Sequence, residues 1–232
     1  MQVLASPSQP RCGLDSSRSV LVVGVELVDR QSYAQELTRQ FYDSSVWEVD
    51  QVWFPLGQPR VPKFVLLNHI LQQQHLDRYD YILVCDDDIQ LPENFLDRYL
   101  AIVEGCDFAL AQPARTHRSD IHHPIVAHVP GLVARQTRFV EIGPLFSMRQ
   151  DVVPLLLPFD ESSPMGWGYE FVWPLQIEPR RMGIVDATPV SHTMRPAVSE
   201  YSGAGDQMIA YLLARPHLSR EDAYTTVQEY LA

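Results

Sequence analysis

Short apolar runs alternate with amphipathic segments through the first half of the chain, and this alternation restricts its possible folds more than any other feature. Runs of apolar or alternating apolar residues predict strands at 19–25, 46–54, 81–85 and 108–111. Apolar residues at helical spacing predict the helices between them, at 32–41, 61–74 and 93–103. This order predicts an α/β fold with a mostly parallel central sheet that helices cover on both faces.

The second half of the chain is less regular. Residues 113–137 are rich in His, Arg and Pro and are predicted to form a long loop. Further strands are expected at 138–148 and 182–190, and further helices at 149–157, 206–214 and 221–231. No linker-like stretch interrupts the chain after its polar start, so we expect a flexible N-terminus at 1–18 and a single domain over 19–232.

The chain carries 18 Lys and Arg against 29 Asp and Glu, a formal net charge of −11. Nucleic-acid binders need cations for their phosphate contacts, so this balance argues against a nucleic-acid partner. An anionic substrate still fits such a chain if a divalent cation lies between the two. The cysteines have no CxxC spacing, and Cys85 and Cys106 lie in or beside apolar runs, as buried reduced thiols do.

The N-terminal residues show no cationic-then-apolar signal pattern, and no apolar run approaches the ~20 residues of a membrane span. We therefore expect a cytoplasmic protein without a transmembrane segment, with peripheral contact with a membrane left open. The oligomeric state is not readable from the sequence.

Three consecutive aspartates, Asp86, Asp87 and Asp88, follow the third predicted strand directly. Side chains alternate along a strand, so Asp86 and Asp88 should project to the same side with like charges a few ångströms apart. Hard divalent cations prefer carboxylate oxygens and complete their shells with substrate phosphates. The alternative is a solvated acidic turn that caps the helix beginning near Pro92, although one Asp suffices for that. The triplet therefore predicts a metal site.

Two further features carry chemistry. Gly166 and Gly168 flank Trp167 in a pattern typical of a tight turn, which can present the carboxylate of Glu170 into a cleft. The same pattern is typical of an ordinary turn with a core Trp and a surface Glu. His192 follows the last predicted strand and is a candidate nitrogen ligand for the same cation, unless it is simply structural.

These features, in this order, resemble the GT-A glycosyltransferases. More specifically, the chain resembles an uncharacterised plant and bacterial family once labelled lysine-ketoglutarate-reductase trans-splicing related. The resemblance spans roughly residues 78–195 and rests on the motifs AQPA (111–114), HHPI (122–125), FVEIGPLFS (139–147), GWGYE (166–170) and GIVD (183–186) followed by His192. That family more often has Asp at the position of Glu170, so the reach of the carboxylate differs here.

The resemblance implies a GT-A-like domain with a nucleotide-binding half, an acceptor and catalytic half and C-terminal helices, at 19–112, 113–200 and 201–232. It implies that Asp88 and Asp86, completed by His192, hold Mn²⁺ or Mg²⁺ against the departing diphosphate of a nucleotide-sugar. Glu170 would be the general base that deprotonates an acceptor hydroxyl in an inverting reaction.

Substrate contacts are implied for Asp86, Asp87, Trp167, Gly168, Lys63 and Arg195. Asp86 would contact the nucleotide ribose or the waters of the metal, and Trp167 would pack on a sugar. Lys63 and Arg195 would contact the diphosphate, as would Arg60. The nucleotide base would lie near the end of the first strand, around residues 24–26. The donor would be a nucleotide-diphosphate sugar and the acceptor a glycan, a lipid or a small molecule.

The predicted loop contains five further candidates, Arg115, His117, Arg118, His122 and His123. They belong either to a lid or acceptor-recognition segment or to an exposed loop without a role.

Two other functions compete with glycosyl transfer. Haloacid-dehalogenase-like phosphatases also place Asp-x-Asp after an apolar strand, which would make Asp86 a nucleophile and Asp88 its neighbour at the metal. Their motif usually follows the first strand, whereas two predicted strands precede it here. The third reading is a non-catalytic module that binds a nucleotide-sugar or glycan.

Overall fold

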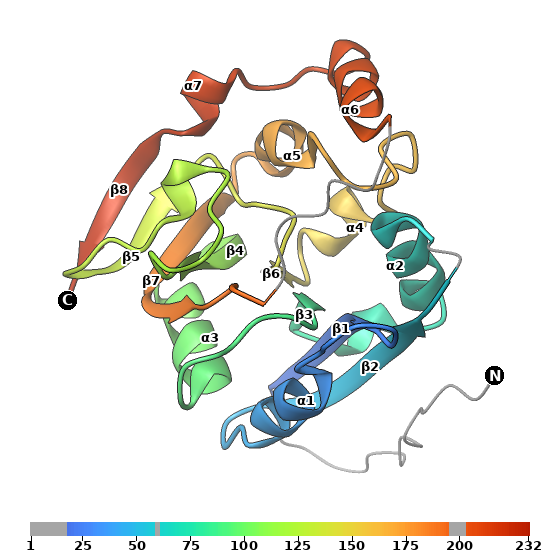
Figure 1. Cartoon of the computed structure of the whole chain (residues 1–232). Helices are drawn as coiled ribbons and strands as arrows, with labels where there is room; N and C mark the ends of the chain where they lie inside the picture. The colour runs from blue at the N-terminus through green and yellow to red at the C-terminus, as the bar shows by residue number, and fades with distance from the viewer. Residues whose placement is uncertain (1–17, 59–60, 195–202) are drawn as a thin grey trace.

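The computed structural model describes residues 18–58, 61–194 and 203–232. They form a single mixed α/β domain around one eight-stranded sheet, with helices on both faces (Figure 1). Within these three ranges no helix is long and apolar enough to cross a membrane.

The sheet has the strand order β2-β1-β3-β6-β4-β7-β5-β8. The strands are β1 Ser19–Leu27, β2 Glu48–Leu56, β3 Tyr81–Asp86, β4 Phe108–Arg115, β5 Leu132–Thr137, β6 Leu145–Arg149, β7 Arg181–Val190 and β8 Thr226–Leu231. The pairs β1·β2, β1·β3 and β4·β7 are parallel. The pairs β3·β6, β4·β6, β5·β7 and β5·β8 are antiparallel.

The sheet is therefore mostly antiparallel, and the prediction of a mostly parallel sheet is wrong. Parallel neighbours need a crossover connection, usually a helix, and the alternation that predicts such crossovers ends after β4. The second half of the chain inserts β6 between β3 and β4 in the opposite direction and adds β5 and β8 at one side.

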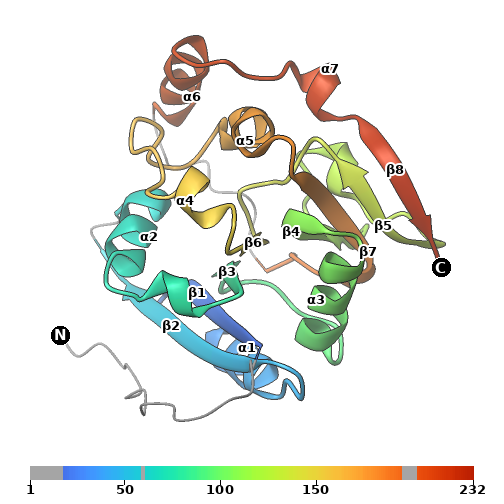
Figure 2. The ribbon, with the colours of Figure 1, turned by 180° about the vertical axis from the view of Figure 1, so that it is seen from behind.

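Helices cover the sheet on both faces. They are α1 Ala34–Tyr42, α2 Lys63–Leu71, α3 Phe95–Gly105, α4 Val153–Leu156, α5 Tyr169–Ile177, α6 Ala204–Leu213 and α7 Arg220–Ala223. α1 and α3 pack on one face, and α2, α4 and α5 pack on the other, as the two opposite views show (Figure 2). The three helices predicted in the first half are confirmed.

The side chains of β1 are buried on both faces of the sheet. Leu21 and Val23 belong to the core that includes α2 and α5, whereas Val20 and Val22 belong to the core that includes α1 and α3. All four side chains are completely buried. A strand that is buried on both faces is a continuous apolar run in the sequence, as residues 19–25 are.

The predicted loop at 113–137 is not a single loop. It contains the end of β4, a 3₁₀ turn at Pro124–Val126 and the whole of β5. The strand predicted at 138–148 begins only at Leu145, because the residues before it form the connection into β6.

The last helix, predicted at 221–231, is also wrong. The helix α7 ends at Ala223, and β8 follows it and pairs with β5. Thr225, Thr226 and Val227 are β-branched and favour a strand. Ser219 caps α7, since its Oγ accepts the Asp222 N–H at 3.0 Å.

The ends of four strands meet at one edge of the sheet. β1 is parallel to β3, β4 is parallel to β7, and β6 is antiparallel to both β3 and β4. These four strands therefore end at the same edge, with Leu27, Asp86, Arg115 and Val190 as their last residues. Ligands of α/β sheets bind beyond this carboxyl edge.

Candidate active site

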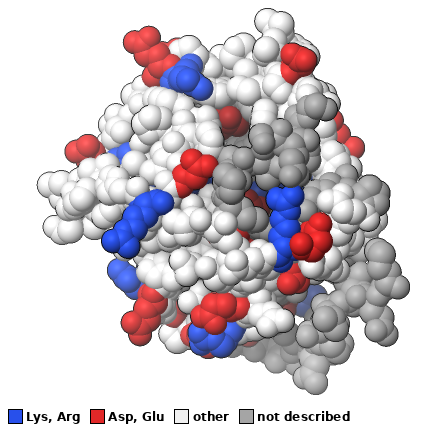
Figure 3. All heavy atoms as spheres, in the orientation of Figure 1, with Lys and Arg blue, Asp and Glu red and all other residues white. Residues whose placement is uncertain are grey.

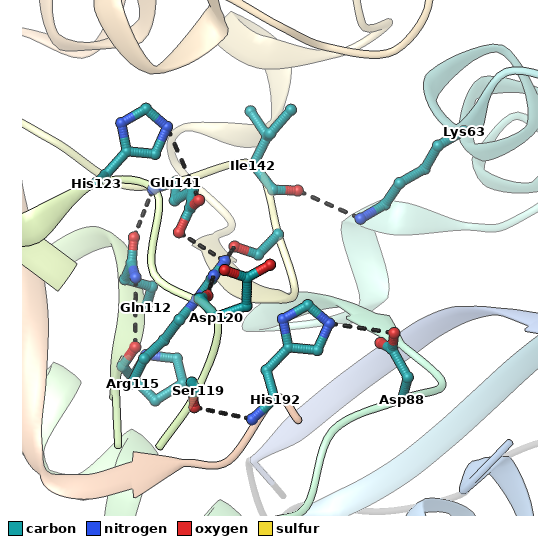
Figure 4. Close-up of polar contacts among 12 residues, drawn as sticks. Lys63, Asp88, Gln112, Arg115, Ser119, Asp120, His123, Glu141, Ile142 and His192 are labelled. Atoms are coloured by element: carbon teal, nitrogen blue, oxygen red, sulfur yellow. Dashed lines mark hydrogen bonds and ion pairs between the residues drawn. The ribbon is translucent and has the colours of Figure 1, made fainter. Parts of the chain in front are cut away.

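The aspartate triplet lies at the carboxyl edge, and its side chains have different partners. β3 ends at Asp86, so strand alternation does not continue through Asp87 and Asp88. Asp86 Oδ1 lies 2.6 Å from Lys63 Nζ. Lys63 Nζ also donates to the Ile142 carbonyl at 3.3 Å (Figure 4). Asp86 therefore faces α2 and the connection that leads into β6.

Asp87 is buried, with 1% of its surface exposed, and it bonds to the connection between β1 and α1. Its Oδ2 accepts the Leu27 N–H at 2.9 Å, and its carbonyl accepts the Tyr33 N–H at 2.6 Å. These bonds give Asp87 a positioning role at the end of β1. A direct contact between Asp87 and the substrate stays a prediction.

Asp88 meets His192 across the edge. Asp88 Oδ2 lies 3.1 Å from His192 Nε2, and both side chains are mostly buried (Figure 4). Gln90 and Ser191 exchange two backbone hydrogen bonds, at 2.8 and 3.0 Å, which bring the chain after β3 against the chain after β7. The His192 N–H also donates to Ser119 Oγ at 3.0 Å. Backbone contacts from three segments therefore fix this pair.

Asp88 and His192 fit a divalent cation. A carboxylate oxygen and an imidazole nitrogen both suit Mn²⁺, and adjacent ligands at about 2.1 Å in an octahedral shell lie about 3 Å apart. His192 Nδ1 is buried without a hydrogen-bond partner. In the part of the chain that the structure describes, no three His, Cys, Asp or Glu side chains gather as metal ligands. Of the three predicted ligands, the structure brings Asp88 and His192 together, whereas Asp86 contacts Lys63. Metal ligation by Asp86 stays a prediction.

The Gly-Trp-Gly turn is built against α2. Gly166 and Gly168 have φ angles of +79° and +99°, a left-handed backbone that glycine adopts without strain. A Cβ atom on Gly166 would lie 2.2 Å from the ring of Phe64, so the turn packs directly on this helix. Ser163 Oγ donates to the Trp167 carbonyl at 2.7 Å, and the Trp167 residue is half-buried.

Glu170 lies in the first turn of α5 and is buried, which excludes the alternative of a surface Glu. Its Oε2 accepts the Gly168 N–H at 3.1 Å. Burial raises the pKa of Glu170 to about 7, and the charge of Glu141 raises it by a smaller amount. A carboxyl group with this pKa can accept a proton near neutral pH, as a general base must.

Glu141 is a second buried carboxylate at this edge, and no sequence pattern singles it out as a site residue. Its Oε2 lies 2.7 Å from an Arg115 terminal nitrogen, and its Oε1 lies 3.9 Å from His123 Nε2 (Figure 4). Burial raises the pKa of Glu141 to about 7, against the opposing charge of Arg115. Burial also lowers the pKa of His123 to about 4. One signal was available, since a charge within the apolar run 139–142 needs a buried partner.

The remaining predicted residues are two arginines and the five candidates of the 113–137 segment. Arg60 and Arg195 lie outside the described residues. Three of the five loop candidates are exposed, namely His117, Arg118 and His122. Only Arg115 and His123 of that group turn inward, so the loop has one buried face and one solvated face.

Both cations named at these strand ends are already paired, Lys63 with Asp86 and Arg115 with Glu141. Among the described residues on the face shown in Figure 3, side chains of both signs are scattered and form no basic patch. With Asp88 included, this edge carries more carboxylates than described cations. An anionic diphosphate would therefore fit here with a divalent cation between it and the protein.

Comparison with solved structures identifies the fold. GalNAc-T7, crystallised with UDP, GalNAc and Mn²⁺, matches 84% of this chain with a TM-score of 0.50 and 11% identity. The chain has a GT-A-type fold. Residues 1–349 of TarS from S. aureus match 76% of the chain (TM-score 0.46, 10% identity), and A197 from STIV matches 92% (TM-score 0.45, 10% identity).

The chain spans 47% of the GalNAc-T7 chain, 60% of the TarS chain and 93% of the A197 chain. At these identities the likeness shows the fold and not the activity. Neither a family model nor a curated protein sequence matches the chain.

Proposed function

We propose that the protein is a metal-dependent glycosyltransferase that moves a sugar from a nucleotide-diphosphate sugar to an acceptor hydroxyl. The observation that carries this proposal is the Asp88–His192 pair, whose oxygen and nitrogen lie 3.1 Å apart at the carboxyl edge of a GT-A-type sheet. The motif resemblance to the plant and bacterial family supports the same activity. The crystal structure of GalNAc-T7, which contains UDP, GalNAc and Mn²⁺, agrees with the proposed donor class.

Asp88 and His192 would hold Mn²⁺ or Mg²⁺ between them. Such a cation, when bound, neutralises the departing diphosphate as a Lewis acid. Asp86 lies two residues from Asp88, and Lys63 fixes its carboxylate. From this position Asp86 would accept a hydrogen bond from the nucleotide ribose or from a water on the cation.

The donor would lie across the strand ends. Asp87 fixes the end of β1, where the nucleotide base would bind. Lys63 is 18% exposed at its side chain and would share its charge between Asp86 and the diphosphate, with Arg195 as a further phosphate contact. Trp167 and the Gly168 backbone would line the part of the site that binds the sugar. The half-buried indole of Trp167 offers a flat apolar surface for it.

Glu170 would take the proton of the acceptor hydroxyl. Its pKa of about 7 suits this role near neutral pH, and the Gly168 N–H orients one of its oxygens. A carboxylate base on the acceptor side favours inversion of the anomeric centre. The acceptor would be a glycan, a lipid or a small molecule.

Thermal unfolding against a panel of nucleoside diphosphates, each with and without Mn²⁺, tests the proposal. A ligand at a hundredfold excess over its dissociation constant stabilises the native state by about 2.7 kcal/mol. We expect one nucleoside diphosphate to raise the melting temperature only when Mn²⁺ is present. Asp88→Ala should abolish this shift, whereas Asp77→Ala, at an exposed position before β3, should keep it.

Other outcomes point to the competing functions. A shift with Mg²⁺ and a phosphate mimic, but with no nucleotide, would support the phosphatase. A nucleotide-sugar that binds with Mn²⁺ but is never consumed would support the binding module. Glu170→Gln should keep nucleotide binding and stop transfer, and full transfer by this variant would remove Glu170 from the base role.

A further inference from the structure

The end of α2 and the short helix α4 enclose a hollow, whereas the start of α2 meets the carboxyl edge of the sheet. The two helices lie side by side (Figure 1, Figure 2). The volume of the hollow is about 390 Å³, within the range of small-molecule sites in proteins. Six apolar residues line it, namely Leu71, Leu76, Val153, Pro154, Leu157 and Pro158. A concave apolar surface of this size is typical of a site for an apolar ligand.

The polar part of the lining carries no charge. The other three lining residues are Asn68, Gln72 and Gln150, whose side chains are neutral amides. Gln72 is exposed, and its side-chain amide has no hydrogen-bond partner among the described residues, so it can bond to the hydroxyl group of a ligand. Asn68 Nδ2 donates to Glu161 Oε1 at 3.0 Å, and the charge of Glu161 repels an anion. The lining therefore fits an uncharged ligand with a hydroxyl group better than a carboxylate.

The volume of the hollow sets the size of the ligand. One heavy atom with its hydrogens takes about 30 Å³, as a water molecule does in the liquid, so the hollow holds about a dozen heavy atoms. Its walls are preformed, because Pro154 and Pro158 restrict the backbone on one side. The Leu157 N–H also donates to the Val153 carbonyl at 2.9 Å, which fixes the end of α4. A straight-chain alcohol of about ten carbons matches this size.

Asn68 connects the hollow to the segment that leads into the Gly-Trp-Gly turn. Asn68 is 4% exposed, and its amide exchanges two hydrogen bonds with the backbone of Phe159, both at 2.8 Å. One turn earlier on α2, the Phe64 N–H donates to the Pro164 carbonyl at 3.1 Å. α2 therefore holds the 159–164 segment at two points, and the hollow lies beside one of them.

We infer that the hollow binds an uncharged, hydroxyl-bearing hydrocarbon chain of about a dozen heavy atoms, and that the bound chain stabilises the contact between Asn68 and Phe159. Asn68 and Pro158 both line the hollow, so separating Asn68 from Phe159 takes its walls apart. A ligand that binds only the intact hollow opposes this separation by mass action. The hollow is therefore an effector site for the segment before the Gly-Trp-Gly turn, and it does not depend on the proposed glycosyl transfer.

Equilibrium dialysis of the full chain against radiolabelled straight-chain alcohols, from 1-hexanol to 1-tetradecanol, tests the binding. We expect one alcohol per chain and an affinity that rises about fourfold with each added CH₂ group, because each buried CH₂ contributes a nearly constant free energy. The rise should stop at about eleven carbons, where the hollow is full. An affinity that keeps rising to 1-tetradecanol, or the absence of saturable binding, would overturn the inference.

Decanoate tests the preference for an uncharged ligand. The wild type should bind decanoate about fivefold or more weakly than 1-decanol, because no cation lines the hollow. Gln72→Lys supplies a cation at the exposed amide, so it should strengthen decanoate binding by about threefold and change 1-decanol binding by less than about twofold. Equal affinities of the wild type for decanoate and 1-decanol would contradict the assigned ligand class.

Val153→Phe fills part of the hollow. Val153 lines the hollow and is 5% exposed, whereas Leu155, on the same helix, is 40% exposed and does not line it. Val153→Phe should weaken 1-decanol binding by about tenfold and move the chain-length limit to shorter alcohols. Leu155→Phe is the control and should change neither. If the wild type self-associates and Val153→Phe makes it monomeric, the hollow is an interface between two copies of the chain, and the inference is overturned.

Hydrogen exchange measures the effect of the ligand on the Asn68–Phe159 contact. The Phe159 N–H donates to Asn68 Oδ1, so it exchanges when this contact opens. At a tenfold excess over its dissociation constant, 1-decanol should slow this exchange by about tenfold. The Asp222 N–H, which donates to Ser219 Oγ at the start of α7, is the control and should keep its rate. Binding of 1-decanol without slower exchange at Phe159 would overturn the effector role.

Discussion

Glu170→Gln should change how the stability of the protein depends on pH. The Glu170 pKa is about 7 in the folded protein because the carboxyl is buried, whereas the ordinary value is 4.5. Between these pH values the unfolded chain has released the proton while the folded chain still binds it, so the free energy of unfolding falls as pH rises. A difference of about 2.5 pKa units at 1.36 kcal/mol each corresponds to about 3 kcal/mol.

Urea unfolding at pH values from 4.5 to 8 measures this effect. The stabilising contribution of the protonated carboxyl is fully present below about pH 4.5 and is lost as pH passes about 7. Glu170→Gln removes the titrating group, so the variant should gain about 3 kcal/mol relative to the wild type across this range. Glu93→Gln, at an exposed position, controls for the loss of a surface carboxyl. Parallel curves for wild type and Glu170→Gln would refute a buried Glu170.

Two stability experiments test the packing around the site. Gly166→Ala places a Cβ against the Phe64 ring. It should lower the free energy of unfolding in urea by about 1–3 kcal/mol more than Gly203→Ala does. Gly203 is the control because its φ is also positive but a Cβ there meets open space. Equal losses would show that the turn does not pack on α2. Asp87→Ala should lower the free energy of unfolding by about 1–3 kcal/mol, because it leaves the Leu27 N–H without its carboxylate acceptor. Unchanged stability would contradict the role of Asp87 in positioning the end of β1.

The first half of the fold could be predicted because its signals are local. Residues 19–25 and 81–85 are continuous apolar runs because helices cover both faces of β1 and β3. The meeting of Asp88 with His192 could also be predicted, since each follows the end of a strand and parallel strands end at one edge. These inferences need only residue patterns of a few positions.

The remaining features of the fold and of the site depend on pairings between segments that are distant in the sequence. The direction of β6 is set by its fit between β3 and β4, and no pattern within residues 145–149 specifies it. Lys63 pairs with Asp86 although 23 positions separate the two residues, and Arg115 meets Glu141 across 26 positions. The prediction of a helix over residues 221–231 is wrong for a related reason, because pairing with β5 stabilises β8 as a strand.

Titration of Mn²⁺ by electron paramagnetic resonance tests the central claim most directly, because the signal of free Mn²⁺ falls as the ion binds. The account predicts that, with the nucleoside diphosphate from the thermal panel, the wild type binds one Mn²⁺ per chain. It predicts that Asp88→Ala and His192→Ala lose this binding, while Asp77→Ala keeps it. Undiminished Mn²⁺ binding by the folded Asp88→Ala and His192→Ala variants would contradict the proposed metal–diphosphate site.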